Sequence, residues 1–141
     1  MLLAWLVAGT ADIVVACTYY PLTVDAHVLQ ILQGIAAGVL GAGAFDGGVA
    51  TALLGLGCHY LIALIWTAIF FAIYRRLPAL SRHRVVTAIG YGALVSMAMT
   101  FVVLPLSRVA PRPFDPGFFA VATLILICTI GTPLTWFASM P

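Results

Sequence analysis

Two ionisable side chains lie inside long apolar runs of this chain, and their types suit proton chemistry. Asp12 lies in the run 2–20, and His59 lies near the middle of the run 47–74. An aspartate at the centre of a membrane costs about 2.5–3.5 kcal/mol on insertion scales, so it has to be paired or neutral. A histidine titrates near neutral pH, and burial can bring a carboxylate into the same range.

Two interpretations of Asp12 and His59 remain open. In the first they form a hydrogen-bonded contact between helices, a kind of bond worth about 0.6 kcal/mol in membrane bundles. In the second they form a proton-accepting or cation-sensing site. Their depths differ, about 24 Å along the helix for His59 against about 15 Å for Asp12, so a bridging water would be needed. The candidate supporting residues are Ser96, Cys58, Gln30 and His27.

No cofactor, metal or enzyme motif is expected. Bis-histidine haem needs two histidines at one depth, but His27 is expected at an interface and His83 in a loop. Cys58, His59, Met97 and Met99 are of the types that bind copper. The two methionines, however, are expected on different faces of their helix, which argues against a copper site. The chain has no GxSxG, HExxH, P-loop or paired-carboxylate pattern, which predicts a protein that is not an enzyme.

The composition is that of a membrane protein. Of 141 residues, 64% are hydrophobic and only 7% are charged, whereas soluble domains carry about a quarter charged residues. The net charge of +2 is too small for a nucleic-acid surface. The lipid bilayer is therefore the expected partner, and residues 1–141 are expected to form a single transmembrane domain.

The apolar runs predict an all-α integral membrane protein with four transmembrane helices and one short additional helix. The spans are expected at about 2–20, 47–74, 85–106 and 117–137. Pro21 is expected to end the first span, and Pro133 to kink or end the last one. The segment 24–40, with Thr23 as its cap, carries polar residues on one side and is interpreted as interfacial or re-entrant; a fifth span is the alternative.

Charge sets the expected orientation. Four arginines lie in 75–84, two in 107–116, and none between the first two spans. The positive-inside rule then places the N- and C-termini in the cytoplasm. The first segment is expected to be retained rather than cleaved as a signal peptide, because no Lys or Arg precedes it and Asp12 interrupts it.

The second span has a face of small residues, which predicts close helix packing: Gly48, Ala52, Gly55 and Ala63. Because so short a chain encloses little interior, a homo-oligomer or a larger membrane-protein partner is expected. The first functional hypothesis is a non-enzymatic, self-associating or accessory subunit of a larger membrane complex. The second is a small transporter or proton-linked channel that uses Asp12 and His59.

Two short patterns recur along the chain. Residues 20–23 (YPLT) resemble 104–107 (LPLS), and residues 45–48 (FDGG) resemble 114–117 (FDPG). They predict a parallel two-plus-two repeat, with coincidence as the alternative because such pairs are common at helix ends. The repeat would align Asp12 with Ser96.

Four stretches together resemble a group of small bacterial four-helix inner-membrane proteins that has no assigned activity. The stretches are 8–13 (AGTADI), 27–34 (HVLQILQG), 44–59 and 102–107. The resemblance covers most of the chain. It implies the four-helix architecture and the bacterial inner (cytoplasmic) membrane, and it leaves the function open.

Overall fold

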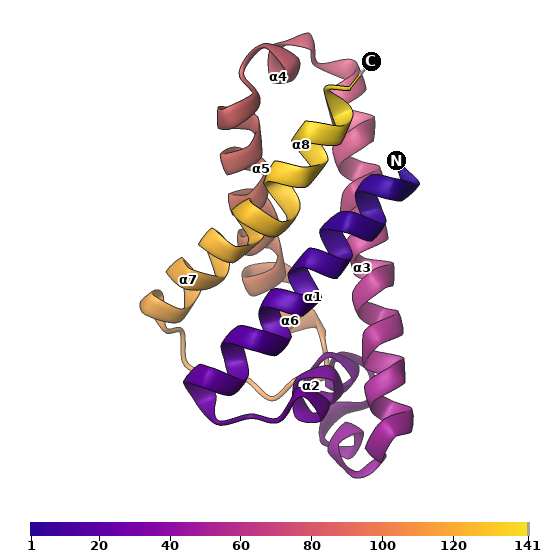
Figure 1. The fold of residues 1–141 in the computed structure, drawn as a ribbon. Coiled ribbons are helices and arrows are strands. Elements are labelled where there is room, and N and C mark those ends of the chain that lie inside the picture. The colour runs from indigo at the N-terminus through magenta and orange to yellow at the C-terminus, as the bar shows by residue number, and fades with distance from the viewer. Residues whose placement is uncertain (141) are drawn as a thin grey trace.

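A computed structural model describes residues 1–140, and every regular element in that range is helical. This confirms the predicted all-α class. Four long rods pack together and alternate in direction, so the two termini lie at the same end of the bundle (Figure 1). Alternating directions are compatible with a parallel repeat, but any up-and-down bundle shares them. The rods are α1 (Leu2–Val24), α3 (Gly48–Arg76), α5 (Arg84–Ala98) with its continuation, and α7 (Pro116–Leu126) continuing into α8 (Thr132–Ala138).

The third and fourth rods each contain a π-helical turn, η2 (Met99–Val103) and η3 (Ile127–Gly131). A proline follows each turn, Pro105 in α6 (Leu104–Leu106) and Pro133 in α8. Proline lacks an N–H, and its ring crowds the carbonyl four residues earlier, a conflict that the wider turn relieves. Pro133 therefore does not end the last span, which continues to Ala138.

The first rod is longer than the sequence suggests. Pro21 lies inside α1, which continues to Val24 and ends at Asp25 in the left-handed conformation (φ 50°). Proline is tolerated in membrane helices because neighbouring groups can satisfy the freed backbone. The Thr23 hydroxyl donates within this last turn, to the Tyr19 carbonyl at 3.0 Å. Thr23 is consequently not the cap of the next helix.

The short second helix lies at the end of the bundle opposite the termini (Figure 1). It consists of α2 (Val28–Leu40), followed by the 3-10 turn η1 (Gly41–Asp46). It begins at Val28 rather than at residue 24, because the backbone N–H of His27 is capped by Gln30 Oε1 at 3.0 Å. The buried Gln33 ties α2 to α3 by donating to the Gly48 carbonyl at 3.1 Å.

Small residues let α3 approach its neighbours closely. A side chain at Gly55 would collide with the Leu32 carbonyl of α2, and Ala63 faces Gly9 of α1. Ala52 is also buried. Three of the four residues of the predicted packing face are thus covered by helices of this same chain, whereas Gly48 is exposed and has a positive φ.

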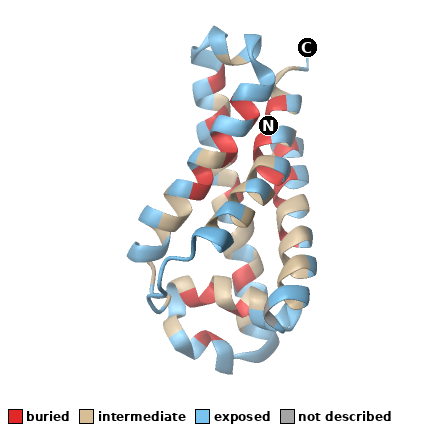
Figure 2. Ribbon diagram, turned by 90° about the vertical axis from the view of Figure 1, so that its left-hand side faces the viewer, coloured by how far each residue is buried: buried red, intermediate tan, exposed pale blue. Residues whose placement is uncertain are grey.

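The main core lies near the end that holds the termini. It joins α3, α5 and α8 and contains Phe70, Tyr74, Tyr91, Val95 and Leu134, all buried (Figure 2). The Tyr91 hydroxyl donates to the Trp66 carbonyl at 2.5 Å, which fixes α5 on α3.

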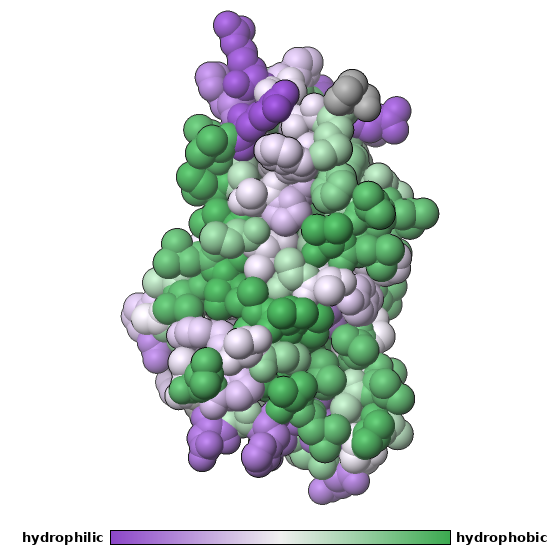
Figure 3. All heavy atoms as spheres, viewed as in Figure 1, coloured by the Kyte–Doolittle hydropathy of each residue, from purple (hydrophilic) through white to green (hydrophobic). Residues whose placement is uncertain are grey.

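On the face seen in Figure 3, the surface is mostly apolar around the middle of the bundle and hydrophilic at its two ends. By length and composition, five helical segments could cross a membrane: Leu2–Thr23, Val28–Asp46, Gly48–Arg76, Arg84–Leu106 and Pro116–Ala138. At the end that holds the termini, α3 finishes at Arg76, and the short helix α4 (Pro78–Arg82) connects it to α5.

Candidate functional site

The half-buried Asp12, in the middle of α1, meets the fourth rod. Its carboxylate Oδ1 lies 2.8 Å from the hydroxyl of Thr129, a buried residue of η3. The two residues are 117 positions apart in the chain. The contact therefore joins the first and last rods, and it is the only hydrogen bond of the Asp12 side chain within residues 1–140.

The backbone around Thr129 is shaped by Pro133. In a regular α-helix the N–H of residue 133 would bond the carbonyl of residue 129, but proline has no N–H to donate. The chain instead forms the π turn, in which the Thr132 N–H reaches the Ile127 carbonyl five residues earlier. Thr129 lies at the centre of this turn, and π turns of this kind are frequent at functional sites.

The Thr129 hydroxyl has two acceptors within reach but only one proton. Its Oγ1 lies 2.8 Å from Asp12 Oδ1 and 2.9 Å from the Ile125 carbonyl. A threonine hydroxyl donates one hydrogen bond and can accept others. When Asp12 is ionised, the hydroxyl donates to the carboxylate. When Asp12 is protonated, the carboxyl O–H donates to Thr129, which donates in turn to Ile125. Both protonation states of Asp12 are therefore hydrogen-bonded.

His59 binds α1 one helical turn away from Asp12. Its Nε2 lies 2.8 Å from the carbonyl oxygen of Gly9. Because a carbonyl only accepts, Nε2 must carry the proton in this contact. Within the described chain no hydrogen bond or ion pair joins the Asp12 and His59 side chains. The direct pair considered from the sequence is thus not formed. His59 of α3 bonds α1 at Gly9, whereas the Asp12 carboxylate bonds Thr129 of the fourth rod.

Tyr60 and Trp5 hold α1 against α3 beside this site. The Trp5 Nε1–H donates to the Tyr60 carbonyl at 2.8 Å, and the Tyr60 and Thr10 hydroxyls lie 2.9 Å apart. The Tyr60 ring also lies over Gly9, where an added Cβ would come within 3.1 Å of it. These contacts fix the position of His59 relative to Asp12.

The residues expected to support the site lie elsewhere. Ser96 hydrogen-bonds Thr123 at 2.7 Å, between α5 and α7. His27 and Gln30 are exposed at the start of α2. Cys58 is half-buried and has no hydrogen bond among the described residues. None of these four residues bonds Asp12 or His59.

Sequence reasoning missed Thr129 and Tyr60. The pattern Thr-x-x-x-Pro at 129–133 could have drawn attention to Thr129. No local pattern marks Tyr60, because its role depends on which helix packs against α3. In residues 1–140 no group of three or more His, Cys, Asp or Glu side chains is placed to hold a metal ion.

Comparisons of the chain with protein-family models, with curated proteins and with solved structures find no match.

Proposed function

We propose that Asp12 binds and releases a proton inside the membrane, and that the chain is a small non-enzymatic transport protein or channel component linked to protons. The observation that carries this proposal is the pairing of Asp12 with Thr129. A hydroxyl with two acceptors and one proton accommodates both the charged and the neutral carboxyl. Ionisable residues inside transmembrane segments are, by default, functional-site candidates.

Asp12 has no cation to neutralise it. Within residues 1–140 no ion pair is formed, and the six arginines all lie at the ends of the rods or in the segments between them. An unpaired carboxylate in apolar surroundings is strongly disfavoured, and a carboxyl group there takes up a proton instead. We infer that Asp12 rests in the protonated form and is ionised only transiently.

The other titratable groups on the facing elements are few. His59 and Tyr60 lie on α3, Tyr20 lies further along α1, and η3 carries Cys128, which is exposed. Neither α7 nor α8 contains an acid or a base. His59, which bonds α1 at Gly9, is therefore the group we propose to exchange a proton with Asp12, through its ring or through a water molecule.

The proposed placement has four crossing rods, with α2 and η1 at the membrane surface. It is supported by the position of α2 at one end of the bundle (Figure 1) and by its length of 13 residues, or about 20 Å, short of a core about 30 Å thick. The arginine-rich end, with both termini, would face the cytoplasm. The bacterial inner membrane is proposed from the resemblance alone.

Proton flux into liposomes tests the function. The purified protein is reconstituted with an entrapped pH-sensitive dye, and flux is driven by a potassium diffusion potential. We expect Asp12→Asn to abolish flux and His59→Leu to reduce it without changing the assembly. Ser96→Ala, at a polar contact away from the site, should conduct normally. Equal flux through Asp12→Asn and the unaltered protein would refute the proposal, as would no flux above that of empty liposomes.

The second candidate is a self-associating or accessory subunit. The small-residue face that suggested it is covered by α1 and α2, but Gly57 on α3 is exposed and a Cβ there would meet nothing within 4 Å. Exposed small residues favour close approach of another helix. If Gly57→Leu reduces the mass of the assembly in detergent while Asp12→Asn leaves every activity unchanged, this second function is favoured.

A further inference from the structure

The end of the bundle that holds the termini carries uncompensated positive charge. Arg75 and Arg76 end α3, Arg82 ends α4, and Arg84 begins α5. Three of the four acids lie at the opposite end, where α1 finishes, η1 finishes and α7 begins: Asp25, Asp46 and Asp115. The fourth, Asp12, is in the middle of α1. Within residues 1–140 no acidic side chain therefore neutralises these arginines, and an anion is the complementary ligand.

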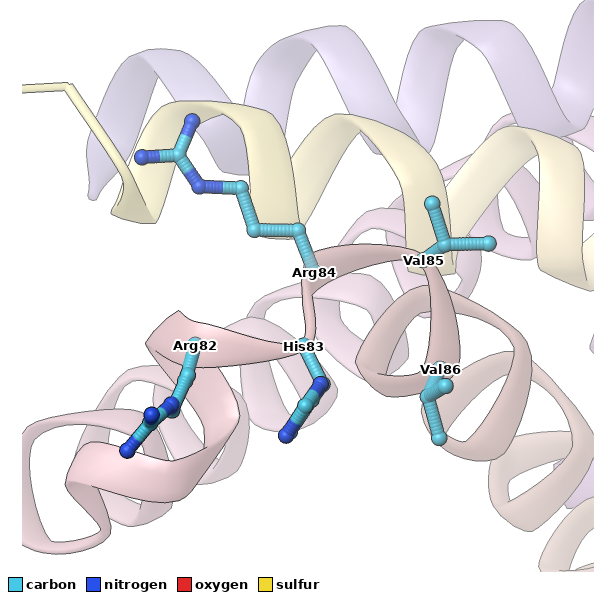
Figure 4. Close-up of a pocket in the computed structure, with 5 residues that line it drawn as sticks. All are labelled: Arg82, His83, Arg84, Val85 and Val86. Carbon is cyan, nitrogen blue, oxygen red and sulfur yellow. The ribbon is translucent and has the colours of Figure 1, made fainter.

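A hollow of about 350 Å³ lies within this basic end and is lined by residues 82–86. Figure 4 shows Arg82 and His83 extending to the same side of the chain, with Val86 next along that side, while Arg84 extends to the other side. Arg82 offers a fork of N–H donors that matches phosphate oxygens, and the His83 ring can donate as well. Val86 is 69% exposed. Arg82 and His83 thus form a basic rim, and the apolar side chain of Val86 lies next to it.

An apolar groove lies further along α5 than Val86. A second hollow, of about 440 Å³, is lined by Gly90, Ala93, Leu94, Met97, Ala98, Phe101 and Val102. Residues spaced by four, seven and eleven positions lie on one face of a helix, so Val86, Gly90, Ala93 and Met97 form a single strip. A Cβ at Gly90 would meet nothing within 4 Å, so the floor of the groove is open.

The strip has the length of one acyl chain. From Val86 to Met97 is eleven residues, or about 16 Å, and half of a membrane core is about 15 Å thick. A free phosphate would use only the basic rim. A helix of a second copy would use the groove but would gain nothing from the arginines.

We propose that this face of α5 binds one anionic phospholipid, with its phosphate at Arg82 and His83 and one acyl chain in the groove over Gly90. The basic rim selects the charge of the headgroup, and the groove requires a chain of lipid length. The site is independent of proton binding at Asp12, so either proposal can fail alone.

Native mass spectrometry of the full chain in mild detergent tests the site. The probes are phosphatidylglycerol and phosphatidylcholine with the same acyl chains, and soluble glycerol phosphate as a competitor. We expect phosphatidylglycerol to bind the more tightly of the two lipids. Arg82→Gln should weaken it about fivefold, the usual effect of one basic residue at an anionic surface. Arg112→Gln, at the opposite end, should have no effect, and glycerol phosphate should not compete.

The groove needs its own variant. Gly90→Leu fills the groove and should weaken the binding of both lipids. Gly57→Leu on α3 should leave lipid binding unchanged. Equal binding of the two lipids, or unchanged binding by Arg82→Gln, would overturn the proposal. Displacement by glycerol phosphate would assign the rim to a free anion instead. A lower oligomer mass for Gly90→Leu with unchanged lipid binding would assign the groove to a second copy.

Discussion

At the scale of single residues, the sequence identifies the ionisable groups but not their partners. Asp12 and His59 stand out because their types conflict with the apolar runs around them, and that conflict is visible without any structure. Their actual contacts are a hydroxyl 117 residues away and the carbonyl of Gly9. Contacts of this kind depend on which helices pack together and in what rotation, and a single sequence does not encode these as a local pattern.

Removing the Thr129 hydroxyl should destabilise the fold. Thr129→Val removes the one hydrogen bond that the Asp12 side chain makes within residues 1–140, and an unsatisfied polar group in apolar surroundings costs about 1–3 kcal/mol. Thr135→Val is the matched control, because Thr135 is also buried but donates to the Gly131 carbonyl of its own helical rod. The free energy of unfolding in mixed micelles measures both. If the two variants lose the same amount, the Asp12–Thr129 bond has no special weight.

At the scale of helices, the sequence predicts their existence well and their interruptions poorly. The apolar runs locate all four rods, because length and hydrophobicity suffice to mark such segments. A proline in the sequence does not by itself show whether a membrane helix ends there. Pro21 is accommodated inside α1, and Pro133 is accommodated by a preceding π turn rather than by a helix end. Whether a proline ends a membrane helix depends on what satisfies the freed backbone, which neighbouring elements decide.

Glycines on α3 provide a test of helix packing. Gly55→Ala places a methyl group against the Leu32 carbonyl of α2 and should cost about 1–3 kcal/mol through overpacking. Gly57→Ala, two residues later and open on its outer side, should be neutral or slightly stabilising, because alanine favours the helix. Thermal unfolding in detergent distinguishes the two. Equal unfolding temperatures would show that α2 does not lie on α3 as described.

At the scale of the whole molecule, charge polarity and helix order were predictable, and the use of the small-residue face was predictable in part. The count of arginines along the chain already separates the two ends. The face containing Ala52, Gly55 and Ala63 suggested contacts with another chain, but α1 and α2 cover it. The docking of the short helix α2 on α3 depends on long-range contacts, which no local pattern marks.

The proposed orientation predicts opposite accessibility of the two ends. In a variant without native cysteines, Ala110→Cys in the loop before α7 should react with a membrane-impermeant maleimide added to intact cells. Ala79→Cys in α4, at the arginine-rich end, should react only after the membrane is permeabilised. Both positions are exposed, so burial does not explain a difference. Labelling of Ala79→Cys alone in intact cells would invert the orientation, and labelling of both would contradict the four-rod placement.

The protonation state of Asp12 tests the central claim most directly. Infrared difference spectroscopy of the reconstituted protein, compared with Asp12→Asn, isolates the carbonyl stretch of one protonated carboxylic acid. Because Asp12 forms no ion pair among the described residues and the Thr129 hydroxyl can accept a hydrogen bond from a carboxyl O–H, the band should be present at neutral pH, decline as the pH rises, and shift in Thr129→Val. A carboxyl that shows no such band at any pH down to mild acid would be permanently ionised, and Asp12 would then not carry a proton.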